Sequence, residues 1–193
     1  MSLPGACVLG AFFVLNVGAS CCVGDCSGGD NGGKPRTYDD NGVTYQYPGA
    51  WSTGKDKNEK AANQLWSVPV LRDSERAILV TAYRLNKPVT SRDVDANLKA
   101  LDAEIQGAIE SDSASISSGP TRATVGGFPA LQYAGTSTFE KDKKSENRWT
   151  FVFNGDTEYF LNCSFAPTGK DDDARRKEVA DACEGVLRTF AAK

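Results

Sequence analysis

The sequence predicts an α+β fold, in which an antiparallel β-sheet of about six to seven strands is flanked by two main helices. Three observations point to this class. Apolar and polar side chains alternate with a period of two in several short segments between residues 43 and 165. Two longer segments place apolar side chains at steps of three and four, as amphipathic helices do. Turns that contain glycine or proline separate most of these segments.

The first half of the folded region begins with strands. Residues 43–47 alternate between apolar and polar side chains, and a proline-glycine pair ends this strand. Residues 65–71 and 77–85 are rich in aliphatic and β-branched side chains, which favour strands. The polar turn at 73–76 lies between them, so we expect these two strands to pair as a hairpin.

The first helix follows these strands. Its apolar face is predicted to consist of Val94, Leu98, Leu101, Ile105 and Ile109. Thr90 or Ser91 is expected to cap the N-terminus ahead of Asp93, because a hydroxyl oxygen there can accept a hydrogen bond from a free backbone N–H. This pattern predicts an amphipathic helix of about five turns.

The second half returns to strands. Residues 116–118 and 122–125 flank a Gly-Pro break, and residues 130–139 form a further strand after a double-glycine turn. The charged residues 140–146 are expected to form its outer loop.

Two aromatic segments follow the charged loop. In residues 149–153, the aromatic side chains of Trp149, Phe151 and Phe153 alternate with Thr150 and Val152, as in a strand. Residues 158–165 form a second, largely apolar segment. The Asn-Gly-Asp turn at 154–156 supplies residues that adopt positive φ readily, so we expect a tight hairpin here.

A second helix closes the chain. Its inward face is predicted to consist of Val179, Cys183, Val186, Leu187 and Phe190. The acidic residues 171–173 mark its start, where negative charge is favourable at the positive end of the helix dipole.

The N-terminal segment is expected to lie outside the folded domain, which we place at residues 37–193. Residues 1–20 are interpreted as a signal peptide, because residues 7–17 form an uncharged apolar run that is shorter than the roughly 20 residues a membrane-spanning helix needs. Residues 21–36 are interpreted as the anchor cysteine with a flexible tether rich in Gly and Asp.

Cys21 is the predicted site of lipid modification. The small residues 18–20 precede it directly, and signal peptidases that cleave beside a cysteine accept only small side chains there. Cys22 and Cys26 fit less well, because Cys21 and Asp25 would precede them. We therefore expect a protein that is lipid-anchored to the cell membrane on its extracytoplasmic side.

The N-terminal segment also allows a second interpretation. The apolar run could be a buried element of the domain, with Cys21, Cys22 and Cys26 in a disulfide or metal cluster. No Lys or Arg precedes Lys34, so the basic start typical of an export signal is missing. However, residues 22–36 cannot pack a core, and a zinc site without histidine would have to recruit distant cysteines. The anchor is favoured, and the role of Cys7 stays open.

Two cysteines fall within the expected domain, Cys163 on the last strand and Cys183 on the inward face of the last helix. Both are expected to point into the same layer, and an exported protein meets an oxidising environment, so a disulfide is favoured. Two buried free thiols are the alternative, because a buried cysteine packs like a small apolar residue.

Charge and composition exclude several classes of function. The 22 basic and 25 acidic side chains give a net charge of −3, which does not favour binding a polyanion such as nucleic acid. The sequence has no histidine, which excludes His-based catalytic triads and zinc sites. We expect no catalytic residues, no cofactor and no metal site.

Two acidic groupings could be mistaken for active chemistry. Asp93 and Asp95 could serve glycoside hydrolysis only in a cleft that the sequence does not reveal. The run 171–173 lacks the alternating ligands, central glycine and distal glutamate of a calcium loop, so helix capping is favoured.

The order of features resembles the PsbP-like fold and, more narrowly, actinobacterial lipoproteins of the LpqN type. The resemblance spans roughly residues 37–193. It rests on GVTYQYPGAW at 42–51, VGGFPA at 125–130, WTFVFNGDTEYFLNCSF at 149–165 and ACEGVLRTF at 182–190. It implies an antiparallel sheet sandwiched by helices.

The resemblance also implies a class of function. Relatives include extrinsic subunits of photosystems, a nuclear-transport cofactor that binds a small GTPase, and envelope lipoproteins, which share binding to other proteins without catalysis. This chain lacks a plastid transit peptide and the histidines that could hold a metal in the photosynthetic branch. The expected function is therefore that of a membrane-anchored accessory protein that binds a protein of the envelope.

A carrier or sensor of a hydrophobic small molecule or envelope lipid is the alternative. It predicts a groove of several hundred Å³ between a helix and the sheet, in the usual range for ligand pockets. Aromatic side chains could line such a groove, although most of them are needed in the core. The candidates are Tyr45, Tyr47, Trp51, Trp66, Trp149, Phe151 and Phe153.

Overall fold

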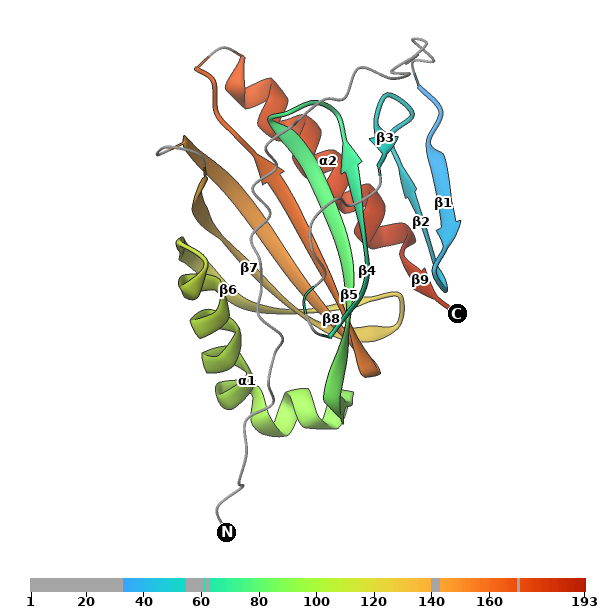
Figure 1. Cartoon of the computed structure of the whole chain (residues 1–193), viewed down its shortest axis with the longest axis vertical. Coiled ribbons are helices and arrows are strands. Elements are labelled where there is room, and N and C mark those ends of the chain that lie inside the picture. The colour runs from blue at the N-terminus through green and yellow to red at the C-terminus, as the bar shows by residue number, and fades with distance from the viewer. Residues whose placement is uncertain (1–32, 55–60, 62, 140–142, 170) are drawn as a thin grey trace.

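The computed structural model describes residues 33–54, 61, 63–139, 143–169 and 171–193 (Figure 1). The predicted anchor site Cys21, the other N-terminal cysteines and the whole predicted signal peptide lie outside these residues. The elements in chain order are β1 (Arg36–Asp40), β2 (Val43–Tyr47), β3 (Ser52–Thr53), β4 (Gln64–Leu71), β5 (Arg76–Val89), α1 (Ser91–Ser111), β6 (Ala114–Val125), β7 (Phe128–Phe139), β8 (Lys143–Phe165), α2 (Asp172–Thr189) and β9 (Ala191–Ala192).

The predicted fold class is confirmed. Six strands form one antiparallel sheet in the order β3-β4-β5-β8-β7-β6, and β1, β2 and β9 form a second, smaller antiparallel sheet. The two helices pack on opposite faces of the large sheet, since successive residues of β8 contribute to two separate core layers. Leu161 packs with α2 and the small sheet, whereas Phe160 packs with α1. α2 lies between the large and small sheets (Figure 1).

The hairpin predicted at residues 154–156 is wrong. β8 runs through this point as one strand between β5 and β7. β7 pairs with its first half, from Lys143 to Val152, and β5 pairs with its second half, from Gly155 to Phe165. Gly155 does adopt a positive φ of 62°, but the chain does not reverse there. The pairing irregularity at this level lies in β5, between Arg84 and Val89, which pair with Thr157 and Gly155. Neighbouring strands already pair with both halves, so the halves do not pair with each other.

The predicted outer loop at 140–146 is also partly wrong, because β8 begins at Lys143. The polar and charged side chains at the start of β8 form hydrogen bonds with α2 and β7. Glu146 receives two hydrogen bonds from the guanidinium of Arg176 on α2, at 2.7 and 2.9 Å. Asn147 and Ser145 form a buried hydrogen-bonded group with Ser137 of β7. Polar side chains therefore fill this end of the sheet.

The small sheet contains two strands that the sequence did not predict. β1 lies at an edge with both faces largely exposed, so its residues lack the alternation that indicates a strand. It begins at Arg36, which is the last residue of the tether predicted at 21–36 and lies opposite Tyr47. β9 consists of two residues that pair with the start of β2. Both strands depend on tertiary pairing with β2 rather than on local sequence.

Thr90 is the N-cap of α1. Its hydroxyl accepts a hydrogen bond from the Asp93 backbone N–H at 3.3 Å, and the Asp93 carboxylate accepts one from the Thr90 backbone N–H at 2.9 Å. This reciprocal arrangement is a capping box. The Ser91 side chain takes no part in it.

We expect Thr90→Ala to lower the free energy of unfolding by about 1 kcal/mol, because it removes the side-chain acceptor of the cap. Ser91→Ala is the matched control and should leave stability almost unchanged. Urea unfolding monitored by circular dichroism measures both. Equal effects of the two substitutions would contradict the assignment of the cap.

Candidate ligand cleft

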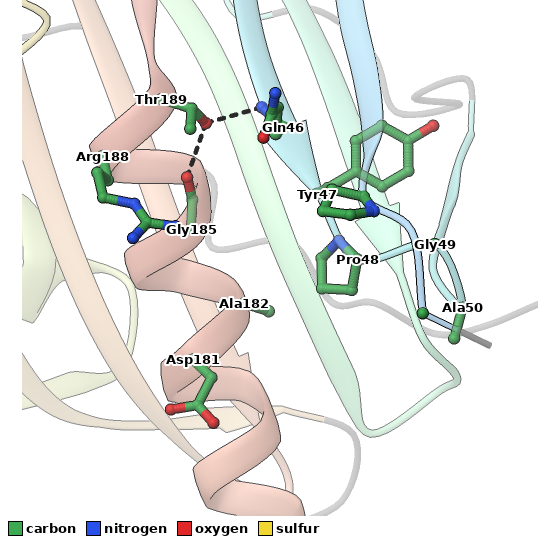
Figure 2. A pocket seen from close by; sticks show the side chains of 12 residues that line it. Gln46, Tyr47, Pro48, Gly49, Ala50, Asp181, Ala182, Gly185, Arg188 and Thr189 are labelled. Carbon is green, nitrogen blue, oxygen red and sulfur yellow. Dashed lines mark hydrogen bonds between the residues drawn. The ribbon is translucent and has the colours of Figure 1, made fainter.

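A cleft of about 300 Å³ lies between α2 and the end of β2, beside Gly33 and Pro35 (Figure 2). It is the candidate functional site. It is lined by Gly33, Pro35, Gln46, Tyr47, Pro48, Gly49, Ala50, Asp181, Ala182, Gly185, Arg188 and Thr189. Most of this lining is apolar or small, as in sites that hold hydrophobic molecules.

One wall of the cleft is the turn after β2. The strand ends at Tyr47, and the Pro48 carbonyl accepts a hydrogen bond from the Trp51 backbone N–H at 2.9 Å, which closes the turn. The Trp51 side chain is buried in the core layer shared with α2. The turn is thereby fixed at both ends, and residues 48–50 face the cleft as a rigid apolar rim.

The other wall is the small-residue side of α2. Ala182 and Gly185 lie one turn apart and leave the helix backbone close to the cleft. A Cβ atom placed on Gly185 would meet nothing within 4 Å, so the space beside this residue is open. Thr189 closes one end, since its hydroxyl accepts a hydrogen bond from the Gln46 backbone N–H at 2.8 Å and donates to the Gly185 carbonyl at 2.7 Å (Figure 2).

The charged groups at the cleft differ in their pairing. Asp181 forms an ion pair with Lys177, four residues earlier on the same helix, at 2.5 Å. Arg188 is exposed, and within the described part of the chain it has no ion-pair or hydrogen-bond partner. Lys34 and Arg36 flank the lining residue Pro35 in the sequence, and they are likewise exposed and unpaired among the described residues. The cleft therefore carries free positive charge.

The disulfide pair expected from the sequence lies directly behind this wall. Cys163 of β8 and Cys183 of α2 form a disulfide with their Cα atoms 6.0 Å apart, and both residues are buried. Cys183 follows Ala182, which lines the cleft. The bond ties α2 to the large sheet at the level of the cleft.

Most of the aromatic residues considered for a groove belong to the core. Tyr45, Trp51, Trp149, Phe151 and Phe153 are buried in the two core layers and do not line the cleft. Trp66 is partly buried and packs against the ring of Tyr159. Tyr47 alone of the seven contributes to the cleft.

The two acidic groupings have structural roles. Asp93 belongs to the capping box of α1, and Asp95 pairs with Arg122 of β6. At the start of α2, Asp172 accepts hydrogen bonds from the backbone N–H groups of residues 168 and 169. The described residues contain no cluster of three metal-ligating side chains and no helix that is long and apolar enough to span a membrane.

Sequence reasoning missed one unusual carboxyl group, that of Glu158 on β8. The side chain is 1% exposed, and its Oε2 atom has no hydrogen-bond partner within the described structure. Burial raises the pKa of this group to about 8. The alternation of β8 was a usable signal, because it places Glu158 on the same face as the core residue Phe160. The residues that line the cleft lie on the other side of the sheet.

The arrangement of sheets and helices defines a PsbP-like fold. Among solved structures, cyanobacterial PsbP (CyanoP) from Synechocystis matches with a TM-score of 0.55 and 12% identity, over 89% of this chain and 99% of that chain. LpqN of Mycobacterium tuberculosis, a protein involved in cell envelope biogenesis, matches with a TM-score of 0.53 and 15% identity, over 82% of this chain and 88% of that chain.

A protein from Bacteroides thetaiotaomicron is similar at a TM-score of 0.47 and 15% identity over 79% of this chain. The match covers only 45% of that protein's chain. Neither a family model nor a curated protein matches the sequence. The shared property is therefore the fold.

Proposed function

We propose that this protein is a lipid-anchored, non-catalytic accessory module of the cell envelope that binds another envelope protein. The similarity to LpqN carries the proposal, because it covers most of both chains and LpqN acts in envelope biogenesis. The apolar run at 7–17, the small residues before Cys21 and the Gly-rich tether supply the anchor and its position.

The first test is the chemistry of the N-terminus. In a bacterium with a lipoprotein pathway, the wild-type protein should incorporate a clickable palmitate analogue and enter the detergent phase on Triton X-114 partitioning. Intact-mass measurement should give a chain that starts at acylated Cys21. Cys21→Ala should lose the label and the detergent partitioning, because the acyl chains supply the membrane affinity.

Cys22→Ala is the matched control for this test and should retain both properties. A native protein with an unmodified Met1, or label retained in the Cys21→Ala variant, would overturn the proposed anchor. The accessory role itself is tested by in-cell crosslinking, which should capture a reproducible envelope partner.

The cleft favours a second candidate function, binding of a hydrophobic small molecule or envelope lipid. Its volume of about 300 Å³ lies at the lower end of the range for ligand pockets, and one wall is a helix, as this alternative requires. Lipid extraction of denatured protein purified from its own membrane tests this second function, because a carrier brings its ligand with it. A clean extract would contradict the carrier function and leave protein binding as the proposed role.

A further inference from the structure

The cleft combines an apolar lining with a free cation. Arg188 of α2 projects at the wall beside Gly185 and has no partner among the described residues (Figure 2). Most other arginines of the described chain are paired with carboxylates, including Arg72, Arg76, Arg84, Arg122, Arg148, Arg175 and Arg176. An arginine left unpaired beside a cleft is free to bind an anionic group of a ligand, and its planar fork suits phosphate or carboxylate.

Two further exposed cations are sequence neighbours of a residue that lines the cleft. Lys34 and Arg36 flank Pro35, which lines the cleft, and Arg36 lies opposite Tyr47 in the small sheet. The acidic residue on the wall, Asp181, is neutralised by Lys177. The local field is therefore positive although the whole chain carries a net charge of −3. This favours a ligand with net negative charge over a zwitterionic one.

The rest of the lining favours an apolar portion in the same ligand. Pro48 and Ala50 on one side and Ala182 on the other offer only carbon to the cleft at their side chains. A small soluble anion would leave these groups in water, whereas an acyl chain would cover them. A ligand that matches both the free cation and the apolar lining is an anionic amphiphile.

The distance between the cleft and the proposed anchor indicates that the amphiphile is a lipid of the anchoring membrane. Gly33 and Pro35, at the start of the described part of the chain, are part of the lining. About twelve residues separate Cys21 from Gly33, and even a fully extended chain of this length spans only about 40 Å, so an acylated Cys21 would hold the cleft within about 40 Å of the membrane. The cleft therefore lies where the lipids of the anchoring membrane are the most abundant amphiphiles.

We propose that the cleft binds one anionic phospholipid of the anchoring membrane, with its phosphate on Arg188 and the start of an acyl chain between Ala182 and the turn at 48–50. The inference rests on the proposed anchor for the source of the lipid. It assigns Arg188 as the residue that recognises the headgroup and Gly185 as the residue that keeps the apolar part of the cleft open.

Native mass spectrometry of the full chain in a mild detergent tests this inference, with short-chain phosphatidylglycerol and phosphatidylcholine as probes. The wild type should bind one phosphatidylglycerol per chain, at least about tenfold more tightly than phosphatidylcholine. Both lipids offer a phosphate to Arg188, but the quaternary ammonium of phosphatidylcholine would lie in the positive field of the cleft. Arg188→Gln should lose this preference. Arg92→Gln, which removes an exposed unpaired arginine of α1, should retain it.

Gly185→Leu is the second variant. The space beside Gly185 accepts the new side chain, and leucine is the better helix former, so the protein should unfold at a temperature no lower than the wild type. Binding of phosphatidylglycerol should nevertheless fall by about tenfold or more, because the leucine fills the cleft. A stable variant that has lost binding separates the site from the fold.

Three results would overturn the inference: equal binding of the two lipids, unchanged binding by the Arg188→Gln variant, or equally effective competition by sn-glycerol 3-phosphate. The last result would indicate a site for a free phosphate. Cys21→Ala should bind the lipid like the wild type in this assay, because the cleft does not contain the acyl group. An acylated wild-type protein that binds no phosphatidylglycerol therefore refutes the cleft site alone, whereas a wild-type protein that keeps an unmodified Met1 in its own host and still binds the lipid refutes the anchor alone.

Discussion

The protein should be less stable at about pH 8 than at about pH 5, and Glu158→Gln should remove most of this difference. Glu158 lies on β8 with its carboxyl group buried and Oε2 unpartnered in the described structure. Burial raises its pKa in the folded state to about 8, against an ordinary value of 4.5. The folded chain therefore retains a proton that the unfolded chain releases.

The sign follows from the number of bound protons. Above about pH 4.5 the unfolded state loses the proton of Glu158 while the folded state keeps it, so rising pH favours unfolding until the folded group also ionises near pH 8. The corresponding loss between about pH 5 and pH 8 is about 3 kcal/mol. Glutamine is neutral in both states and close in shape, so the variant should lack this dependence.

Urea unfolding at a series of pH values measures the effect. Glu110→Gln is the matched control, because Glu110 is exposed on α1. This control should keep the pH dependence of the wild type. A Glu158→Gln variant with the same pH dependence as the wild type would show that the buried carboxyl is not its source.

Loss of the disulfide should lower the free energy of unfolding by about 3 kcal/mol. The bond joins residues separated by 20 positions, Cys163 on β8 and Cys183 on α2. A crosslink restricts the unfolded chain, and the loop length sets the size of the effect in the chain-entropy description. For a domain of this size, the melting temperature should fall by roughly 6 to 12 °C.

The double variant Cys163→Ala, Cys183→Ala and a reducing agent should have matching effects. Calorimetry with and without dithiothreitol compares them, and the reducing agent should not destabilise the double variant further. Equal stability of the oxidised wild type and the double variant would contradict the predicted contribution. The other cysteines are present in both proteins, so they do not confuse the comparison.

Periodicity identified most of the elements because their apolar faces are buried on one side. The face of α1 and the strands around residues 43–47, 65–71 and 130–139 follow this rule. The Asn-Gly-Asp segment at 154–156 has the local sequence of a hairpin turn, and the hairpin prediction relied on it. The two halves of β8 pair with β7 and β5 instead, and these strands lie outside that local segment. β1 was not predicted because both of its faces are largely exposed, so its sequence does not alternate between apolar and polar residues.

The cleft could not be located from the sequence. Its two walls meet through the contact between Gln46 and Thr189, which are 143 positions apart. One local signal was present, since a glycine within a predicted helix often has a packing or functional reason, and Gly185 is such a residue. The sequence also does not show that Arg188 lacks an ion-pair partner among the described residues, because this depends on which side chains lie near it in the folded chain.

The disulfide between β8 and α2 has a consequence for the export that we propose for this chain. A chain made in a reducing compartment has two thiols at these positions, and the bond can form only after arrival in an oxidising one. Under the export that we propose, the chain would lack this crosslink while it is still in the reducing compartment, and it would be easier to keep unfolded for transport. The domain would then gain the last few kcal/mol of its stability only after it has crossed the membrane.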